Sequence, residues 1–261
     1  PLNHTNKGFL PLNVQKLLGF NSEKCLSKKG DKMLKENIVC LLRKGPLYSV
    51  NQSFISCLAD IYSFNRFSTI ISNKKMKKEI IKKLNIDIFI NLQNGNLIDT
   101  FYDETKNVNI EPYKESNLFL SLPKENVLIQ SLFEKICNSF ECFIDFLKDD
   151  TVVIDYTYMW DFVSKYLFDK RVNLIILEIP DNDLTQNIEI ICPTNVYSNV
   201  YFNTNFDNII LIKKDNFYEP IYSYMNIDNS LILTNKMFNL HSNTIIPALS
   251  NAIKKIKDYL V

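Results

Sequence analysis

The residues with potential for chemistry lie in two segments that are far apart in the chain. One is a polar turn at 50–53 that leads into an apolar stretch at 54–59. The other is a buried-strand pattern at 209–212, a turn, and a second strand that starts near Phe217. Hydrolases often place a nucleophile at the start of a helix, opposite a base on a distant strand. The two segments have this layout, with Ser53 at the start of the expected helix.

The residue types at this site argue against catalysis. A serine hydroxyl is a weak nucleophile unless a base takes its proton, and the ring of Phe217 cannot accept one. The chain has two histidines, His4 and His241, and both are remote from Ser53 in sequence. We therefore expect no enzyme activity, and the simplest role for Ser53 is to cap its helix. Glu219 is expected to be a surface acid at a strand edge.

The cysteine pattern predicts buried thiols, with no metal or cofactor site. None of the six cysteines forms a C-x-x-C pair, which argues against zinc. Four of them lie in apolar patterns and are predicted to be buried and reduced, as in a reducing compartment: Cys40, Cys57, Cys137 and Cys142. Cys192 follows a strand pattern, and we assign it no role.

Composition indicates a folded protein with no overall attraction to nucleic acid. Hydrophobic residues make up 46% of the 261 residues, and 30 basic residues nearly balance 29 acidic ones. Abundant Asn, Ile and Lys with little Gly indicate an AT-rich genome. No apolar run is long enough to span a membrane, so we expect no membrane contact. Because the first residue is proline, we expect the chain to be a piece of a longer polypeptide.

A cluster of lysines is the main exception to this balance of charges. A helix predicted over 74–85 carries Lys74, Lys75, Lys77, Lys78, Lys82 and Lys83. Such a run is most simply a solvated helix face. The alternative is a surface that contacts nucleic-acid phosphates.

The order of expected elements predicts an α+β fold with one central, mostly antiparallel sheet and a helix-rich N-terminal half. We expect a single domain, with an N-terminal extension at 1–49, a core at about 38–225 and a helical C-terminal segment at 226–261. Helices are predicted at 53–64, 74–85, 86–102, 124–147 (with a possible break near Asn138), 158–167 and most of 231–260. Strands are predicted at 152–154, 172–179, 188–191, 209–212 and 218–224, while 35–42 fits either state.

This order resembles the ovarian-tumour (OTU) branch of papain-like cysteine proteases. The matching units are the turn and helix at 50–59, the Trp-containing helix and strand at 158–177, and the strand-turn-strand unit at 209–219. The resemblance implies that Ser53 occupies the nucleophile position, Phe217 the histidine position, Glu219 that of the residue orienting the histidine, and Val50 the aspartate that opens the turn. It also implies a cleft that could bind a partner, lined by Asn51, Gln52, Phe54, Trp160, Asn216 and Tyr218.

A second resemblance concerns short phrases spread over the chain: 8–11, 40–45 with 52–55, and 192–195 with 217–221. These phrases resemble a segment of long proteins of nucleocytoplasmic large DNA viruses, related to the large subunit of the poxvirus-type early transcription factor. The resemblance implies a role in viral early transcription, in the virion and the host cytoplasm.

Three functions remain open on the sequence. The leading one is a non-catalytic OTU-like scaffold that binds a ubiquitin-like protein, a peptide or the viral transcription machinery. The second is an active OTU-like hydrolase or deubiquitinase that uses Ser53, Cys57 or Cys192 with a displaced base. The third is a DNA-binding module that uses the helix from Lys74 to Lys83.

Overall fold

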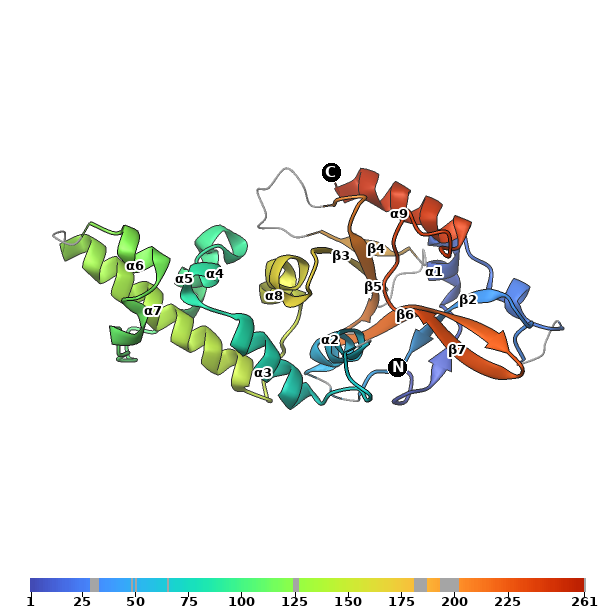
Figure 1. Ribbon diagram of the computed structural model, residues 1–261, viewed down its shortest axis with the longest axis horizontal. Coiled ribbons are helices and arrows are strands. Elements are labelled where there is room, and N and C mark those ends of the chain that lie inside the picture. Colours follow the sequence, from blue (N-terminus) through green and yellow to red (C-terminus); the bar gives the residue numbers. More distant parts are fainter. Residues whose placement is uncertain are drawn as a thin grey trace.

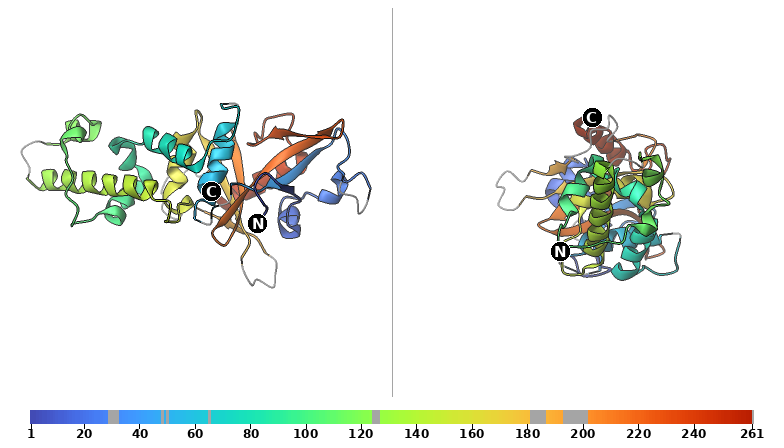
Figure 2. Two further views of the ribbon diagram at one scale, coloured as in Figure 1. Left: turned by 90° about the horizontal axis from the view of Figure 1, so that it is seen from below. Right: turned by 90° about the vertical axis from the view of Figure 1, so that its left-hand side faces the viewer.

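The computed structural model describes residues 1–28, 33–47, 49, 51–64, 66–123, 127–180, 187–192 and 202–260. Figure 1 shows an elongated molecule, with a sheet at one end and a lobe of helices at the other. Figure 2 shows that the longest helix, α7 (Val127–Lys148), runs along this lobe and away from the sheet. None of the described helices is long and apolar enough to cross a membrane.

The described residues form a sheet of seven strands. It is mostly antiparallel, as predicted. The strands are β1 (Lys7–Gly8), β2 (Val39–Lys44), β3 (Val172–Glu178), β4 (Glu189–Ile191), β5 (Asp207–Lys214), β6 (Phe217–Ile227) and β7 (Ser230–Asn235). Their order is β1-β2-β6-β5-β3-β4, and β7 also pairs with β6. Only the pairing of β3 with β5 is parallel among these strands. The protein is therefore a mixed α/β fold with an open central sheet flanked by helices.

Both faces of the sheet are covered, which explains the continuous apolar run in β3. Among the described residues, the other α-helices are α1 (Leu12–Leu17), α2 (Ser53–Ser63), α3 (Asn73–Lys83), α4 (Ile86–Phe89), α5 (Asn96–Phe101), α6 (Asn117–Ser121), α8 (Tyr156–Phe162) and α9 (Pro247–Leu260), and α8 continues as a π-helix at Val163–Leu167. On one face, Leu174 and Tyr218 share a core with α2 and the helical lobe. On the other face, Ile175 and Ile221 share a core with α1 and α9.

The helical lobe is built from α3 to α7, and aromatic side chains fill its interior. The ring of Phe143 contacts those of Phe89 and Phe101 at centroid distances of 5.5 and 4.9 Å. The predicted break of α7 near Asn138 is wrong. The Asn138 amide faces the loop beside the helix, donates to the backbone carbonyls of Asp103 and Lys106, and leaves the helix continuous.

Several predicted elements differ from the structure. Residues 152–154 form a loop and not a strand, with the Ile154 N–H bonded to Asn51 O. The region 86–102 contains α4, a 3₁₀ turn at Leu92–Gly95 and α5, and not one helix. The region 231–260 begins with β7 and becomes helical only at Pro247. Short apolar runs fit both the helical and the strand periodicity, so contacts with the rest of the fold determine which structure forms.

Cys40 is not a free thiol, so that prediction is wrong. It forms a disulfide with Cys25, which lies in the 3₁₀ turn Ser22–Cys25, and the two Cα atoms are 6.0 Å apart. The bond joins this turn to β2. Cys57 and Cys137 are buried free thiols, as predicted, while Cys142 is partly exposed.

Candidate functional site

The structure brings the two distant segments of the candidate site together. Ser53 is the first residue of α2, and Gln52 is the capping residue. The Ser53 hydroxyl donates to the carbonyl of Asn216 and accepts the N–H of Tyr218, each at 3.1 Å. The prediction of a helix cap is therefore wrong, because the hydroxyl bonds to the β5–β6 hairpin instead of its own helix. Ser53 joins α2 to the sheet.

The side chains of Ser53 and Phe217 nevertheless lie on opposite faces of the sheet. Successive residues of a strand point to opposite faces. Tyr218 faces α2, where its ring meets that of Phe54 edge-on at 5.2 Å. Phe217 instead lines a pocket of about 300 Å³ on the other face, together with Ile212 and Glu219. The ring that occupies the proposed histidine position therefore points away from the serine.

The described structure places neither histidine beside Ser53. His4 is exposed, and His241 is hydrogen-bonded to Asn205 at 3.2 Å. Neither ring forms a hydrogen bond with the Ser53 hydroxyl, whose donor and acceptor roles are both used by backbone groups. A base displaced from the usual position is thus not found in the described part of the chain.

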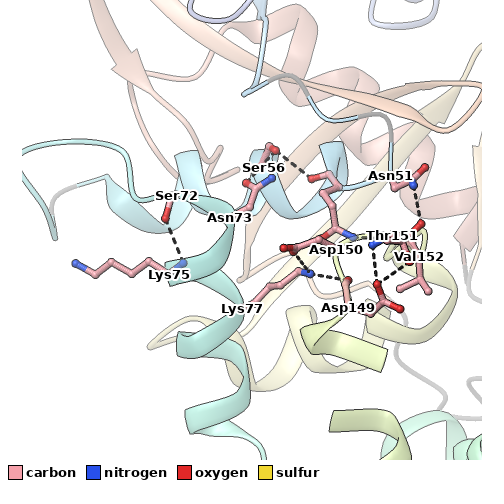
Figure 3. Close-up of polar contacts among 11 residues, drawn as sticks. Asn51, Ser56, Ser72, Asn73, Lys75, Lys77, Asp149, Asp150, Thr151 and Val152 are labelled. Carbon is pink, nitrogen blue, oxygen red and sulfur yellow. Dashed lines mark hydrogen bonds and ion pairs between the residues drawn. The ribbon is translucent and has the colours of Figure 1, made fainter. Parts of the chain in front are cut away.

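The predicted aromatic cleft is filled by core packing. Phe54 and Tyr218 are each 1% exposed, and Trp160 is 8% exposed. Gln52 is also buried, where its amide donates to Val152 O. Asn51 donates to Thr151 O, as Figure 3 shows, and Asn216 is exposed. The prediction of a cleft lined by these residues is therefore wrong, because the aromatic rings are more stable when buried in the core than when lining a groove. Val50 lies outside the described residues.

Glu219 is buried, so the prediction of a surface acid is wrong. One of its carboxylate oxygens pairs with the Arg43 guanidinium at 2.6 Å. The other accepts the backbone N–H of Leu2 at 2.5 Å. The carboxylate therefore holds the N-terminal segment and β2 against β6. Burial of a carboxylate needs such partners.

Neither candidate cysteine has the environment of a nucleophile. The Cys57 thiol is fully buried and donates to the carbonyl of Tyr218 at 3.4 Å. Burial and the nearby carboxylate of Asp60 raise its pKa well above the ordinary value. Cys192 is exposed, but desolvation raises its pKa as well. A reactive cysteine needs a lowered pKa, so both thiols are poor nucleophiles at neutral pH. Residues 193–195, which follow Cys192, lie outside the described residues.

A buried network of charges, which the sequence analysis missed, lies under α2. Asp60 is 2% exposed, and its carboxylate pairs with Lys44 at 2.6 Å and also with Lys236. The Lys236 ammonium also donates to the Asp60 carbonyl at 2.7 Å and lies 5.3 Å from the ring centre of Tyr222. Burial lowers the pKa of Lys236, although Asp60 opposes this shift. The sequence held one sign of this network, because Asp60 interrupts the apolar helical pattern at 54–62.

The lysine helix is confirmed as α3, but its lysines differ in role. Lys77 is 4% exposed and points to the loop before α8, where it binds Asp150 at 2.8 Å and Asp149 O at 2.7 Å (Figure 3). Lys77 therefore stabilises the fold and cannot contact a phosphate. The exposed lysines of α3 are Lys74, Lys75, Lys78 and Lys82, and Lys83 is half-buried. Figure 3 shows Lys75 pointing away from Lys77.

The exposed lysines form one face beside a small group of aromatic rings. Lys74, Lys78 and Lys82 recur every fourth residue, so they lie along the same side of the helix. Lys75 lies 4.5 Å from the ring centre of Phe67, which is 38% exposed. No ion pair involves these exposed lysines within the described ranges. We call Lys74, Lys75, Lys78 and Lys82 the α3 basic face.

The described residues contain no group of three or more His, Cys, Asp and Glu side chains that could hold a metal ion. The fold and the site define a mixed α/β protein in which the Ser53 hydroxyl is engaged by the backbone of a hairpin. No family model matches the sequence, and no curated protein matches it.

Proposed function

We propose that this chain is a non-catalytic, OTU-like interaction domain of a larger viral protein that acts in early transcription. The observation that carries the proposal is the engagement of Ser53, whose hydroxyl is bonded on both sides to hairpin backbone. The two segments lie side by side, but the residue at the histidine position points to the other face of the sheet, and no described side chain acts as a base on the hydroxyl. The viral context is supported by the short phrases, quoted above, that resemble the viral proteins, and by the abundance of Asn, Ile and Lys in the whole chain.

An interaction domain needs an exposed surface, and the tip of the helical lobe supplies one. Large apolar side chains are exposed on α6 and on the first two turns of α7, which lie next to each other in Figure 1: Leu120 (63%), Val127 (76%), Leu128 (81%) and Leu132 (51%). Exposed apolar groups that gather in one region are typical of protein-binding surfaces. We propose that this lobe tip binds a protein partner in the viral transcription machinery.

The non-catalytic part of the proposal is tested with a ubiquitin probe that carries a thiol-reactive group at its C-terminus. We expect no covalent adduct on the purified chain, while an active OTU protease in the same reaction is labelled. A ubiquitin ester substrate tests for a serine nucleophile in the same way. Labelling of Cys57 or Cys192, or ester turnover that Ser53→Ala abolishes, would show that the chain is an active hydrolase.

The binding part is tested with Leu132→Asp in the full-length parent protein. We expect this charge at the lobe tip to reduce co-purification of the RNA polymerase from infected cells by about tenfold, because burying an unpaired carboxylate costs more than 1.4 kcal/mol. The matched control is Leu12→Asp on α1, which is 72% exposed and lies at the sheet end of the molecule. Equal recovery with both variants would refute the lobe tip as the binding surface.

DNA contact is the second candidate, and the α3 basic face is the observation that favours it. The whole chain has a net charge of only +1, yet this helix presents four exposed lysines on one side. Neutralising contacts with phosphates release counterions, so the logarithm of the affinity falls by about 0.9 per contact for each decade of salt. The same feature would also suit an ordinary solvated helix.

Salt titration separates these two interpretations. The affinity for a DNA duplex is measured between about 50 and 200 mM salt, and the logarithm of the affinity is plotted against the logarithm of the salt concentration. We expect the double variant Lys75→Gln, Lys78→Gln to reduce the slope of this plot by about 2. Lys254→Gln with Lys255→Gln on α9 is the control, since both lysines are exposed and lie on another element. Binding that does not depend on salt, or no binding, would refute DNA contact through α3.

A further inference from the structure

The strand β7 is an open edge of the sheet. It pairs with β6 along one side, and no strand in the described part of the chain pairs with its other side. The hairpin that connects them turns at Asp228 and Asn229, which both have positive φ, at 48° and 60°. These angles belong to a type I′ turn, which sets the pairing of a two-residue hairpin. Figure 1 shows this hairpin at the end of the molecule opposite the helical lobe.

The register shows which backbone groups of β7 are unpaired. Beside a two-residue turn, the flanking pair Ile227 and Ser230 exchanges both backbone hydrogen bonds, and every second pair does the same. Ile232 therefore also directs its N–H and C=O towards β6. The N–H and C=O groups of Leu231 and Leu233 point outward instead. No backbone hydrogen bond from either residue to another described residue occupies this outer side.

The first four residues of β7, at 230–233, lack the usual protection of an edge strand against pairing. Natural edge strands carry charges, prolines or bulges that prevent another strand from adding to them. The six residues Ser230–Asn235 include no charged residue and no proline. Tyr224 pairs with Leu233 and Ser223 pairs with Asn235, so Thr234 is an extra residue that forms a bulge near the end of β7. The segment 230–233, before the bulge, pairs regularly with β6. The segment 230–233 is regular and uncharged, so it is suited to accept another strand.

An apolar row of side chains leads to this edge. Val39 pairs with Met225, and Met225 pairs with Ile232, so the three side chains lie side by side on one face of the sheet. Val39 and Met225 are half-buried, and Ile232 is 46% exposed. The row thus ends on an isoleucine with no neighbour across the edge. A strand that supplied an apolar residue opposite Ile232 would continue the row.

We propose that β7 pairs antiparallel with β7 of a second copy of this chain, on a two-fold axis at Ile232. In this register, Leu231 of one copy exchanges backbone hydrogen bonds with Leu233 of the other, which satisfies the outward groups of both. Ile232 stands opposite its counterpart in a non-hydrogen-bonded pair, and the apolar row continues through both sheets. The strand is neutral, so two identical copies meet without like-charge repulsion.

The size of the edge indicates a weak dimer. A pair of six-residue strands with one apolar row buries less area than a standard stable interface. We expect weak association, so dimers form only in concentrated solution or where a longer parent protein holds the copies together.

Sedimentation velocity on the purified chain, from about 5 to 500 µM, tests the association. We expect the average mass to rise from the monomer value of 30.5 kDa towards twice that value. Ile232→Lys places two like charges on the axis and should abolish the rise. Ile227→Lys is the matched control, since Ile227 is 40% exposed on the same hairpin but lies one strand away from the axis, and it should leave the rise unchanged. A wild-type chain that stays monomeric at every concentration, or a dimer that survives Ile232→Lys, would overturn the proposal.

Cross-linking tests the register independently. Cα atoms in a non-hydrogen-bonded pair are about 4.5 Å apart, which suits a disulfide. Ile232→Cys treated with diamide, which oxidises the two thiols, should therefore give a covalent dimer linked at position 232, whereas Ile227→Cys should not. Mass spectrometry identifies the linked peptide and distinguishes it from links through Cys192. No link at position 232, or capture of an unrelated extended peptide by a chain that remains monomeric, would refute a second copy as the occupant.

Discussion

Replacing Ser53 with alanine tests whether this residue is a structural joint. The substitution removes one hydroxyl and leaves two backbone groups of the β5–β6 hairpin without their partner, the N–H of Tyr218 and the C=O of Asn216. The N–H is buried, so its loss of a partner costs about 1–3 kcal/mol. The carbonyl belongs to an exposed residue and can bond to water, so it adds little. We expect Ser53→Ala to lower the free energy of unfolding by about 2 kcal/mol.

The assay is urea unfolding followed by circular dichroism and by tyrosine fluorescence. Ser121→Ala is the control, because its hydroxyl also bonds to a backbone carbonyl, but at an exposed helix end; we expect a change within about 0.5 kcal/mol there. Hydrogen exchange at Tyr218 should speed up in Ser53→Ala and not in the control. A loss below about 0.5 kcal/mol with unchanged exchange at Tyr218 would refute the joint, since a buried N–H without a partner cannot be that inexpensive.

Three further predictions concern the buried charges and the disulfide. Asp60→Ala leaves two buried ammonium groups without their carboxylate, so we expect a loss of about 3–5 kcal/mol in urea unfolding, partly restored when Lys236→Met is added. For Lys236, burial lowers the pKa in the folded state below its unfolded value of 10.5, so the unfolded chain binds more protons between these two values and stability rises with pH there. The stability of the wild type relative to Lys236→Met should therefore increase as the pH rises towards 10.5 in thermal melts, and a constant difference would contradict this. The Cys25–Cys40 disulfide joins residues 15 positions apart, so its reduction should lower the free energy of unfolding by about 3 kcal/mol. Adding a reductant should not lower the stability of a Cys25→Ser variant in the same way, because that variant has no such bond.

Local periodicity carried the predictions that hold. The apolar positions of α2 follow helical spacing, and the continuous apolar run of β3 matches a strand buried on both faces. The turn after β5 separates two strand patterns, which made the β5–β6 hairpin predictable. These patterns arise because each element must bury a face, and the sequence alone records that requirement.

The wrong predictions concern short segments that fit both a helix and a strand, and side chains whose burial depends on a partner far away in the chain. β7 has too few residues for its apolar pattern to distinguish strand from helix, and pairing with β6 selects the strand. Glu219 looks like an exposed acid at a strand edge, but Arg43 lies 176 positions away in the chain and makes its burial favourable. The disulfide of Cys40 likewise depends on where Cys25 packs.

At the candidate site, too, some features follow from the local sequence and others from tertiary packing. The sequence alone determined that no proton acceptor stands at position 217 and that Ser53 begins a helix, because these statements depend only on residue type and local pattern. The OTU resemblance placed Phe217 and Tyr218 on the same side, although neighbours on a strand face opposite sides. The tertiary structure decided which of them faces Ser53. Packing of the Tyr218 ring on Phe54 directs Phe217 to the far face and brings the hairpin backbone to the serine hydroxyl. That choice depends on how residues more than 160 positions apart fill a common core, and such contacts leave no periodic trace in the chain.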